Sequence, residues 1–110
     1  MPVDTIYSMV EVMPHFTGGD TAFFNFINVT VKYPQDAMEA GQSGTSYVTC
    51  VINKDGTVSD VTLFKGASGC TSCDLEALRV FRLMPPWQPG MKEGVPVRVR
   101  MNLPLRFSLR

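Results

Sequence analysis

The C-terminal end of the chain alternates hydrophobic and polar residues without interruption from residue 97 to residue 109. Alternation with a period of two places the two classes on opposite faces of a β-strand, so the pattern predicts a long strand with one buried face. The polar face carries four arginines, Arg98, Arg100, Arg106 and Arg110. At about 3.3 Å per residue, this strand exceeds the ~34 Å diameter of a compact chain of this size, so it must bend or overhang its neighbour.

A β-hairpin is predicted in the middle of the chain. Residues 47–52 alternate and place Val48, Cys50 and Ile52 on one face. Residues 53–56, with the sequence Asn-Lys-Asp-Gly, have the composition of a tight turn, and residues 57–64 form the returning strand. Hydrophobic residues of the returning strand depart from strict alternation, which predicts a bulge near Ser59 and Asp60.

A helix is predicted over residues 21–31, where hydrophobic residues recur at helical spacing and Asp20 precedes them as a candidate N-terminal cap. The aromatic residues Phe23, Phe24 and Phe26 are expected in the core, together with Trp87. Tyr33-Pro34 ends this helix, because a residue before proline avoids helical backbone angles. A short helix is expected over residues 35–40.

A last helix is predicted to begin at Ser72 or Cys73 and to stop before Pro85. Four residues at helical spacing form its expected buried stripe: Leu75, Leu78, Phe81 and Met84. Residues 87–90 are expected to form a rigid turn, and residues 91–96 a loop.

This order of elements predicts a two-layer α+β domain. The expected sheet has three antiparallel strands in the order second–first–third, with the two main helices on one face and the short helix as an extra element. The last strand then lies at an edge, where Pro104 is tolerated. Its unpaired backbone groups would accept a strand from another chain. Residues 1–18 are expected to form an extended lead-in, and residues 19–110 the domain.

The charge is divided unevenly along the 110 residues, although its sum is zero. Residues 1–60 hold seven acidic and two basic residues, giving −5, whereas residues 61–110 hold three acidic and eight basic residues, giving +5. Zero overall charge argues against a nucleic-acid-binding protein, and the hydrophobic content of 45% excludes a disordered chain. No hydrophobic run is long enough to span a membrane, and the first residues do not form a signal peptide, so any export signal is expected to have been removed.

Five landmarks between Val10 and Leu109 resemble the C-terminal domain of TonB, the energy transducer of Gram-negative bacteria. They are Val10-Glu11-Val12-Met13-Pro14 with Gly18-Gly19, Tyr33-Pro34, Lys54-Asp55-Gly56 with Val58 and Val61, Trp87-Gln88-Pro89-Gly90, and Val97-Arg98-Val99 with Asn102-Leu103-Pro104. Each landmark is short, but all five follow the order and spacing of the family.

The resemblance implies a periplasmic binding domain rather than an enzyme, with no cofactor and no metal. Its partner would be the TonB box, a short extended segment of an outer-membrane receptor that pairs with the last strand. The whole protein would be anchored in the inner membrane and driven there by a proton-motive complex. The implied partner-binding residues are Val97, Arg98, Val99, Arg100, Met101, Asn102, Leu103, Tyr33 and Pro34.

The same resemblance admits an alternative, a TonB-like sensor or interaction domain at the end of a membrane signalling peptidase. The domain would be a monomer, or a dimer paired through its edge strands.

Three cysteines allow one disulfide, Cys70 with Cys73 or either of these with Cys50, and an oxidising periplasm would favour its formation. Cys70-x-x-Cys73 before a helix is also the arrangement of thiol–disulfide oxidoreductases. This redox function is the third hypothesis, because no preceding βαβ unit or catalytic partner accompanies the motif. His15 and the three cysteines would formally complete a zinc site, but Cys50 is expected to face the core.

Overall fold

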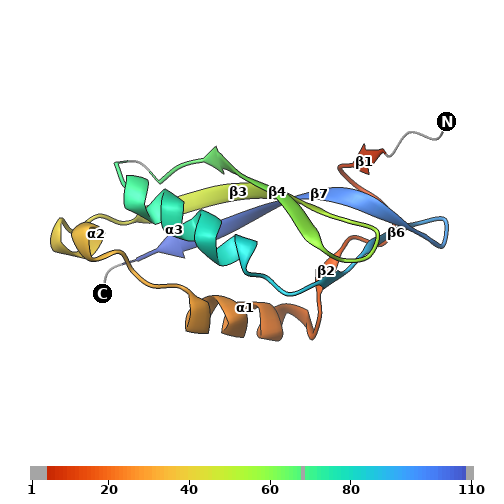
Figure 1. Cartoon of the computed structure of the whole chain (residues 1–110), viewed down its shortest axis with the longest axis horizontal. Helices are drawn as coiled ribbons and strands as arrows, with labels where there is room; N and C mark the ends of the chain where they lie inside the picture. The colour runs from red at the N-terminus through yellow and green to blue at the C-terminus, as the bar shows by residue number, and fades with distance from the viewer. Residues whose placement is uncertain (1–4, 68, 109–110) are drawn as a thin grey trace.

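Three long strands form the centre of the molecule, β3 (Gly44–Ile52), β4 (Val58–Lys65) and β7 (Val95–Phe107), as Figure 1 shows. The computed structural model describes residues 5–67 and 69–108. The three strands are antiparallel and lie in the order β4–β3–β7, which is the order predicted for them. β7 pairs with β3 along nine consecutive residues, from Val99 opposite Ile52 to Phe107 opposite Gly44. The expected bulge is present in β4, where Asp60 has a φ of 53°.

Two short strands make the sheet larger than predicted, and two others pair outside it. β1 (Ile6–Tyr7) adds to β7 in parallel, and β6 (Gly90–Lys92) pairs with the beginning of β7, so the sheet is mixed. β2 (His15–Phe16) and β5 (Trp87–Gln88) form a separate antiparallel ribbon. The prediction of a purely antiparallel, three-stranded sheet is therefore wrong, and so are the predictions of a rigid turn at residues 87–90 and of a loop at residues 91–96. Strands of two or three residues are too short to show a period in the sequence.

Three helices complete the α+β fold: α1 (Gly19–Thr30), α2 (Gln35–Glu39) and α3 (Thr71–Arg82). α1 starts after Gly18, not after Asp20, which lies in the first turn and is favourably placed for the helix dipole. The Cys70 sulfur, rather than a hydroxyl or carboxylate, caps α3 by accepting a hydrogen bond from the Cys73 amide. Within the described residues, no helix combines the length and hydrophobicity that crossing a bilayer requires.

The core lies between the helices and one face of the sheet. The sheet contributes Val48, Cys50, Ile52, Leu103, Leu105 and Phe107, and α3 contributes Cys73, Ala77, Val80 and Phe81. The predicted stripe of α3 is wrong at Leu75, which is 62% exposed. The buried residues of α3 recur at i, i+4, i+7 and i+8 from Cys73, so its core-facing side includes Val80 and leaves Leu75 outside.

Candidate partner-binding edge

The second half of β7 has an open edge. β3 occupies one side of the strand, and β1 occupies the other side only at Arg98 and Val99. Among residues 5–67 and 69–108, no strand pairs with that second side from Arg100 to Phe107. Backbone N–H and C=O groups along this stretch therefore remain available to an additional strand. We call residues 100–107, on the side away from β3, the open edge of β7.

The open edge overlaps only part of the segment that the sequence implied for partner binding. Val97 already pairs with Gly90 of β6, and Arg98 and Val99 lie opposite Ile6 and Tyr7 of β1. The remaining members of the segment, Arg100, Met101, Asn102 and Leu103, belong to the open edge. The available stretch is therefore displaced toward the C-terminus, and it extends beyond the implied segment to Phe107.

β4 forms the opposite edge of the sheet, but its geometry makes it a poorer template for strand addition. Its pairing with β3 is interrupted at two places, and Asp60 adopts a positive φ within the strand. Irregularities of this kind twist an edge and interrupt the repeating pattern of donors and acceptors that another strand would need. In contrast, β7 pairs with β3 without a register shift over its nine paired residues.

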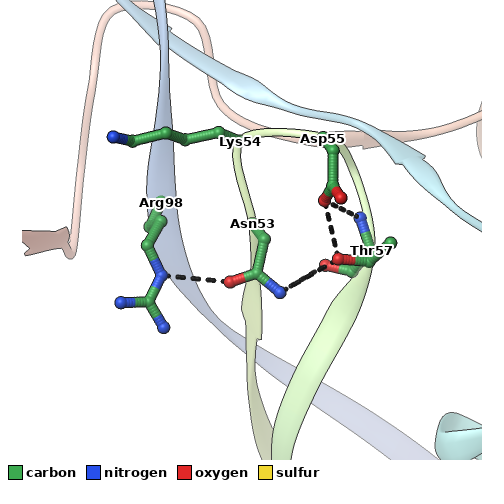
Figure 2. Close-up of a pocket in the computed structure, with 5 residues that line it drawn as sticks. All are labelled: Asn53, Lys54, Asp55, Thr57 and Arg98. Carbon is green, nitrogen blue, oxygen red and sulfur yellow. Dashed lines mark hydrogen bonds between the residues drawn. The ribbon is translucent and has the colours of Figure 1, made fainter. Parts of the chain in front are cut away.

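The arginines of β7 do not form one uniform basic face. Arg100 and Arg106 are exposed, and Arg110 lies outside the described residues. Arg98 is half-buried, and its Nε donates a hydrogen bond to Asn53 Oδ1 at 3.0 Å (Figure 2). Arg98 therefore contributes to the hairpin turn, and Arg100 and Arg106 supply the exposed positive charge of β7.

The hairpin turn beside Arg98 surrounds an open polar pocket of about 480 Å³, lined by Asn53, Lys54, Asp55, Thr57 and Arg98. Asp55 Oδ1 accepts hydrogen bonds from the Thr57 hydroxyl at 2.6 Å and the Thr57 amide at 3.0 Å, which lower the pKa of Asp55 (Figure 2). Asn53 Nδ2 donates to the carbonyl and hydroxyl oxygens of Thr57, both at 3.1 Å. These hydrogen bonds hold the turn in its conformation. Asp55, which belongs to one of the five sequence landmarks, therefore has a structural role in the turn.

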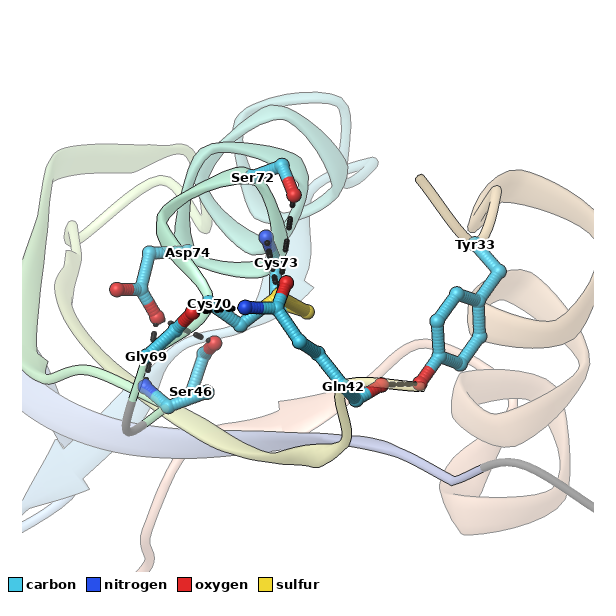
Figure 3. Close-up of a disulfide and its surroundings, with 9 residues drawn as sticks. Tyr33, Gln42, Ser46, Gly69, Cys70, Ser72, Cys73 and Asp74 are labelled. Carbon is cyan, nitrogen blue, oxygen red and sulfur yellow. Dashed lines mark hydrogen bonds between the residues drawn. A yellow bond between two sulfur atoms is a disulfide. The ribbon is translucent and has the colours of Figure 1, made fainter. Parts of the chain in front are cut away.

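Tyr33 lies at the far end of β7 from the implied segment. Its ring packs edge-on against Phe107, with the ring centroids 5.6 Å apart, and its hydroxyl donates to the Gln42 carbonyl (Figure 3). Pro34 is the N-cap residue of α2. The structure therefore places Tyr33 and Pro34 near the C-terminal end of the open edge and away from residues 97–99.

Cys70 and Cys73 form a disulfide at the start of α3 (Figure 3). Both residues are buried, and Asp74 beside them accepts hydrogen bonds from the Ser46 hydroxyl at 2.7 Å and the Ala67 amide at 2.8 Å. Cys50 is a buried free cysteine, and desolvation raises the pKa of its thiol to about 11. A buried disulfide and a neutral thiol do not favour thiol exchange with a substrate. Within the described residues, no group of three metal-ligating side chains converges.

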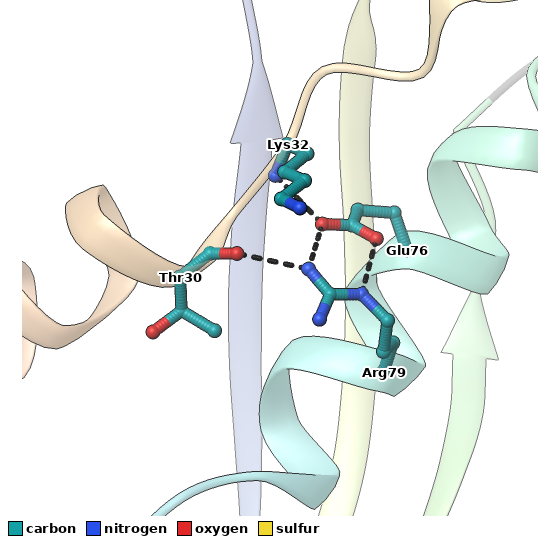
Figure 4. Close-up of polar contacts among 4 residues, drawn as sticks. All are labelled: Thr30, Lys32, Glu76 and Arg79. Carbon is teal, nitrogen blue, oxygen red and sulfur yellow. Dashed lines mark hydrogen bonds and ion pairs between the residues drawn. The ribbon is translucent and has the colours of Figure 1, made fainter.

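A polar cluster fixes the segment that leads from α1 to Tyr33 (Figure 4). Glu76 of α3 accepts hydrogen bonds from Arg79 Nε, Arg79 Nη2 and the Lys32 amide, each at 2.7 Å. The same Arg79 guanidinium donates to the Thr30 carbonyl at 2.9 Å. These contacts, with the hydrogen bond from Arg79 as the main cause, lower the pKa of Glu76. The cluster holds the C-terminal end of α1 against α3.

An apolar groove of about 300 Å³ lies between α1 and the open edge of β7. It is lined by Phe23, Phe24, Ile27, Pro104, Leu105 and Arg106. Phe24 is 60% exposed, so the prediction that it belongs to the core is wrong, whereas Phe23 and Phe26 pack against the core. Sequence reasoning missed this groove, although one signal was present: adjacent aromatic residues on a helix point about 100° apart and do not share one face.

Sequence comparison identifies the family. The model of the family described as Gram-negative bacterial TonB protein C-terminal matches residues 29–109. No curated protein matches the chain. Two solution structures of the Helicobacter pylori TonB C-terminal domain are similar in fold, each with 24% sequence identity. The first, of residues 179–285, has a TM-score of 0.62 and covers 82% of this chain and 79% of its own. The second, of residues 194–285, has a TM-score of 0.58 and covers 80% of this chain and 90% of its own.

Proposed function

Because the chain belongs to the family of TonB C-terminal domains, we propose that it is the receptor-engaging domain of a TonB-like energy transducer in the periplasm. Its partner is the TonB box of an outer-membrane receptor. The family match and the fold support the TonB-like assignment. The observation that carries the binding mode is the open edge of β7, which offers unpaired backbone groups from Arg100 to Phe107.

The receptor segment binds as an additional β-strand beside β7. Main-chain hydrogen bonds supply affinity in this mode, and alternate side chains supply selectivity. The partner-binding residues are those of the implied segment that remain available, Arg100 to Leu103, together with the continuation of the strand to Phe107. Tyr33 and Pro34 border the far end of this site. Binding at Val97 to Val99 requires the partner to displace β1 and β6 or to bind beyond them.

This arrangement suits the transmission of force. β7 is joined to β3 by nine consecutive residue pairs, and the molecule is elongated, with a longest axis of 51 Å. A load applied to a strand on β7 is therefore shared by many backbone hydrogen bonds rather than concentrated on one loop. In the whole protein, a membrane-anchored region would connect the domain to the proton-motive complex of the inner membrane, and transport through the receptor would follow.

NMR titration of the ¹⁵N-labelled domain with peptides from receptor N-termini tests this proposal. We expect the largest amide shifts within residues 100–107, with smaller shifts around Tyr33. A peptide N-methylated at alternate residues is the matched control: methylation of the amides that face β7 should abolish binding, whereas methylation of the intervening amides should preserve it. Saturable binding whose shifts fall only on β4 or α3, or the absence of binding by every peptide, would refute the proposal.

A further inference from the structure

α1 lies almost entirely before the residues that match the family model. The family match begins at residue 29, whereas α1 spans Gly19–Thr30, so nearly all of this helix precedes the matched residues. Figure 1 shows α1 beside the sheet, and the apolar groove between α1 and residues 104–106 borders the open edge of β7. A strand that pairs with this edge will therefore have α1 as a neighbour.

The wall that α1 provides is preorganised. Phe23 packs on Phe16 and Trp87, with ring centroids 5.3 and 5.8 Å apart, and Ile27 is buried. These contacts fix the helix, while Phe24 remains 60% exposed and lines the groove. An exposed aromatic side chain beside an apolar groove gains free energy when a second apolar group covers it.

The groove has one charged residue in its lining, Arg106. The Arg106 side chain is exposed on the outer face of β7, and it has no hydrogen bond or ion pair within the described residues. Leu105, the preceding residue, points to the helix side and is buried. Consecutive residues of an added strand alternate between the same two faces, so one side chain would meet α1 and the next would lie near Arg106.

We propose that α1 and residues 104–106 of β7 form a selectivity subsite for the added strand, an inference that rests on the proposed function. The subsite accepts one apolar side chain against Phe23, Phe24 and Ile27, and Arg106 pairs with an acidic residue adjacent to it in the partner. A volume of about 300 Å³ lies at the lower limit of small-molecule pockets, which fits one large side chain better than a larger ligand. The partner is therefore an extended peptide in which an apolar and an acidic residue are neighbours.

Calorimetric titration of a binding receptor peptide with Phe24→Ala tests the apolar part. We expect affinity to fall about tenfold, since a large side chain loses part of its buried contact area. Val29→Ala is the matched control, because Val29 also lies on α1, is 84% exposed and does not line the groove. Replacing the apolar residue of the peptide with serine should weaken binding to the wild-type domain and have little further effect on Phe24→Ala.

Arg106→Gln tests the electrostatic part. The variant should weaken binding of the peptide with the acidic residue about threefold or more, and it should leave binding of the corresponding amide peptide unchanged. Trp87 fluorescence and circular dichroism verify that each variant is folded.

The possible outcomes separate this inference from the proposed function. Equal affinities for Phe24→Ala and Val29→Ala, with amide shifts still at residues 100–107, would overturn the subsite and leave strand addition intact. Failure of every peptide to shift residues 100–107 of the wild-type domain would overturn both. A peptide-free dimer that Phe24→Ala dissociates would show that the groove holds a second copy of the chain, and would overturn the subsite as a peptide-binding feature.

Discussion

Replacing Gly56 with alanine perturbs the contact that joins the hairpin to the β5 segment. Gly56 has a φ of 88°, and a Cβ atom placed on it would lie 2.1 Å from the Trp87 carbonyl oxygen and 3.2 Å from the Trp87 carbonyl carbon. The Gly56 carbonyl accepts a hydrogen bond from the Trp87 amide at 2.8 Å. Two landmarks of the sequence, residues 54–56 and 87–90, therefore meet through backbone atoms and leave no space for a side chain.

The expected loss of stability follows from two contributions. An L-residue in left-handed backbone conformation costs about 1–2 kcal/mol. Alanine must also displace the Trp87 backbone, and the loss of its hydrogen bond to Gly56 adds about 1 kcal/mol. A total loss of roughly 2–3 kcal/mol is a large part of the 5–15 kcal/mol that typically stabilises a domain.

Urea unfolding followed by the fluorescence of Trp87, the single tryptophan, measures the effect. Gly41→Ala is the matched control, because Gly41 has a φ of 68° and no atom within 4 Å of an added Cβ. We expect Gly56→Ala to lower the free energy of unfolding by at least about 1 kcal/mol more than Gly41→Ala. Equal losses for the two variants would refute the close approach of Gly56 and Trp87.

Three further predictions concern the cysteines, the polar cluster and β1. The native domain should not react with a thiol reagent at neutral pH, because burial raises the pKa of Cys50 to about 11. One thiol should react after unfolding, and three should react after unfolding and reduction. Rapid labelling of the folded domain would contradict the burial of Cys50. The lowered pKa of Glu76 contributes stability above its unfolded pKa of about 4.5, and this contribution is lost as the pH falls through the lower folded pKa. Glu76→Gln should therefore lose less stability than wild type on acidification. Identical pH profiles of the two proteins in thermal unfolding would contradict this assignment. Deleting residues 1–8 removes β1, so it should strengthen peptide binding roughly two- to tenfold and extend the amide shifts to Arg98 and Val99. Deleting residues 1–4 is the control and should have neither effect. Unchanged affinity and shifts after the longer deletion would show that the partner uses residues 100–107 alone.

The long elements could be predicted from the sequence because each repeats its pattern many times. β7 and the hairpin carry enough alternating residues to define their faces, and the crossover through α3 then fixes the order β4–β3–β7. The short strands could not be predicted in this way. Their positions depend on tertiary contacts, such as Phe16 opposite Trp87 and the Trp87 amide bonded to Gly56.

The candidate site could be predicted only in part, because it includes both a long strand and tertiary contacts. Alternation identified the strand and its inner and outer faces, but it could not show that β1 and β6 occupy residues 95–99. The groove beside Phe24 was also missed, since it depends on how α1 lies against β7 in space. Helical spacing alone likewise could not decide that Leu75 is exposed and Val80 buried, because this depends on which side of α3 packs against the sheet.

Hydrogen–deuterium exchange of individual amides, with and without a receptor peptide, tests strand addition to β7 most directly. Along an antiparallel strand, amides alternate between pointing toward β3 and pointing toward the open edge. We predict that peptide binding slows exchange at every second amide from Arg100 to Phe107 and leaves exchange along the outer edge of β4 unchanged. Pro104 has no backbone N–H and therefore gives no signal. Uniform or absent protection along residues 100–107 with the peptide bound, or new protection along β4, would contradict it.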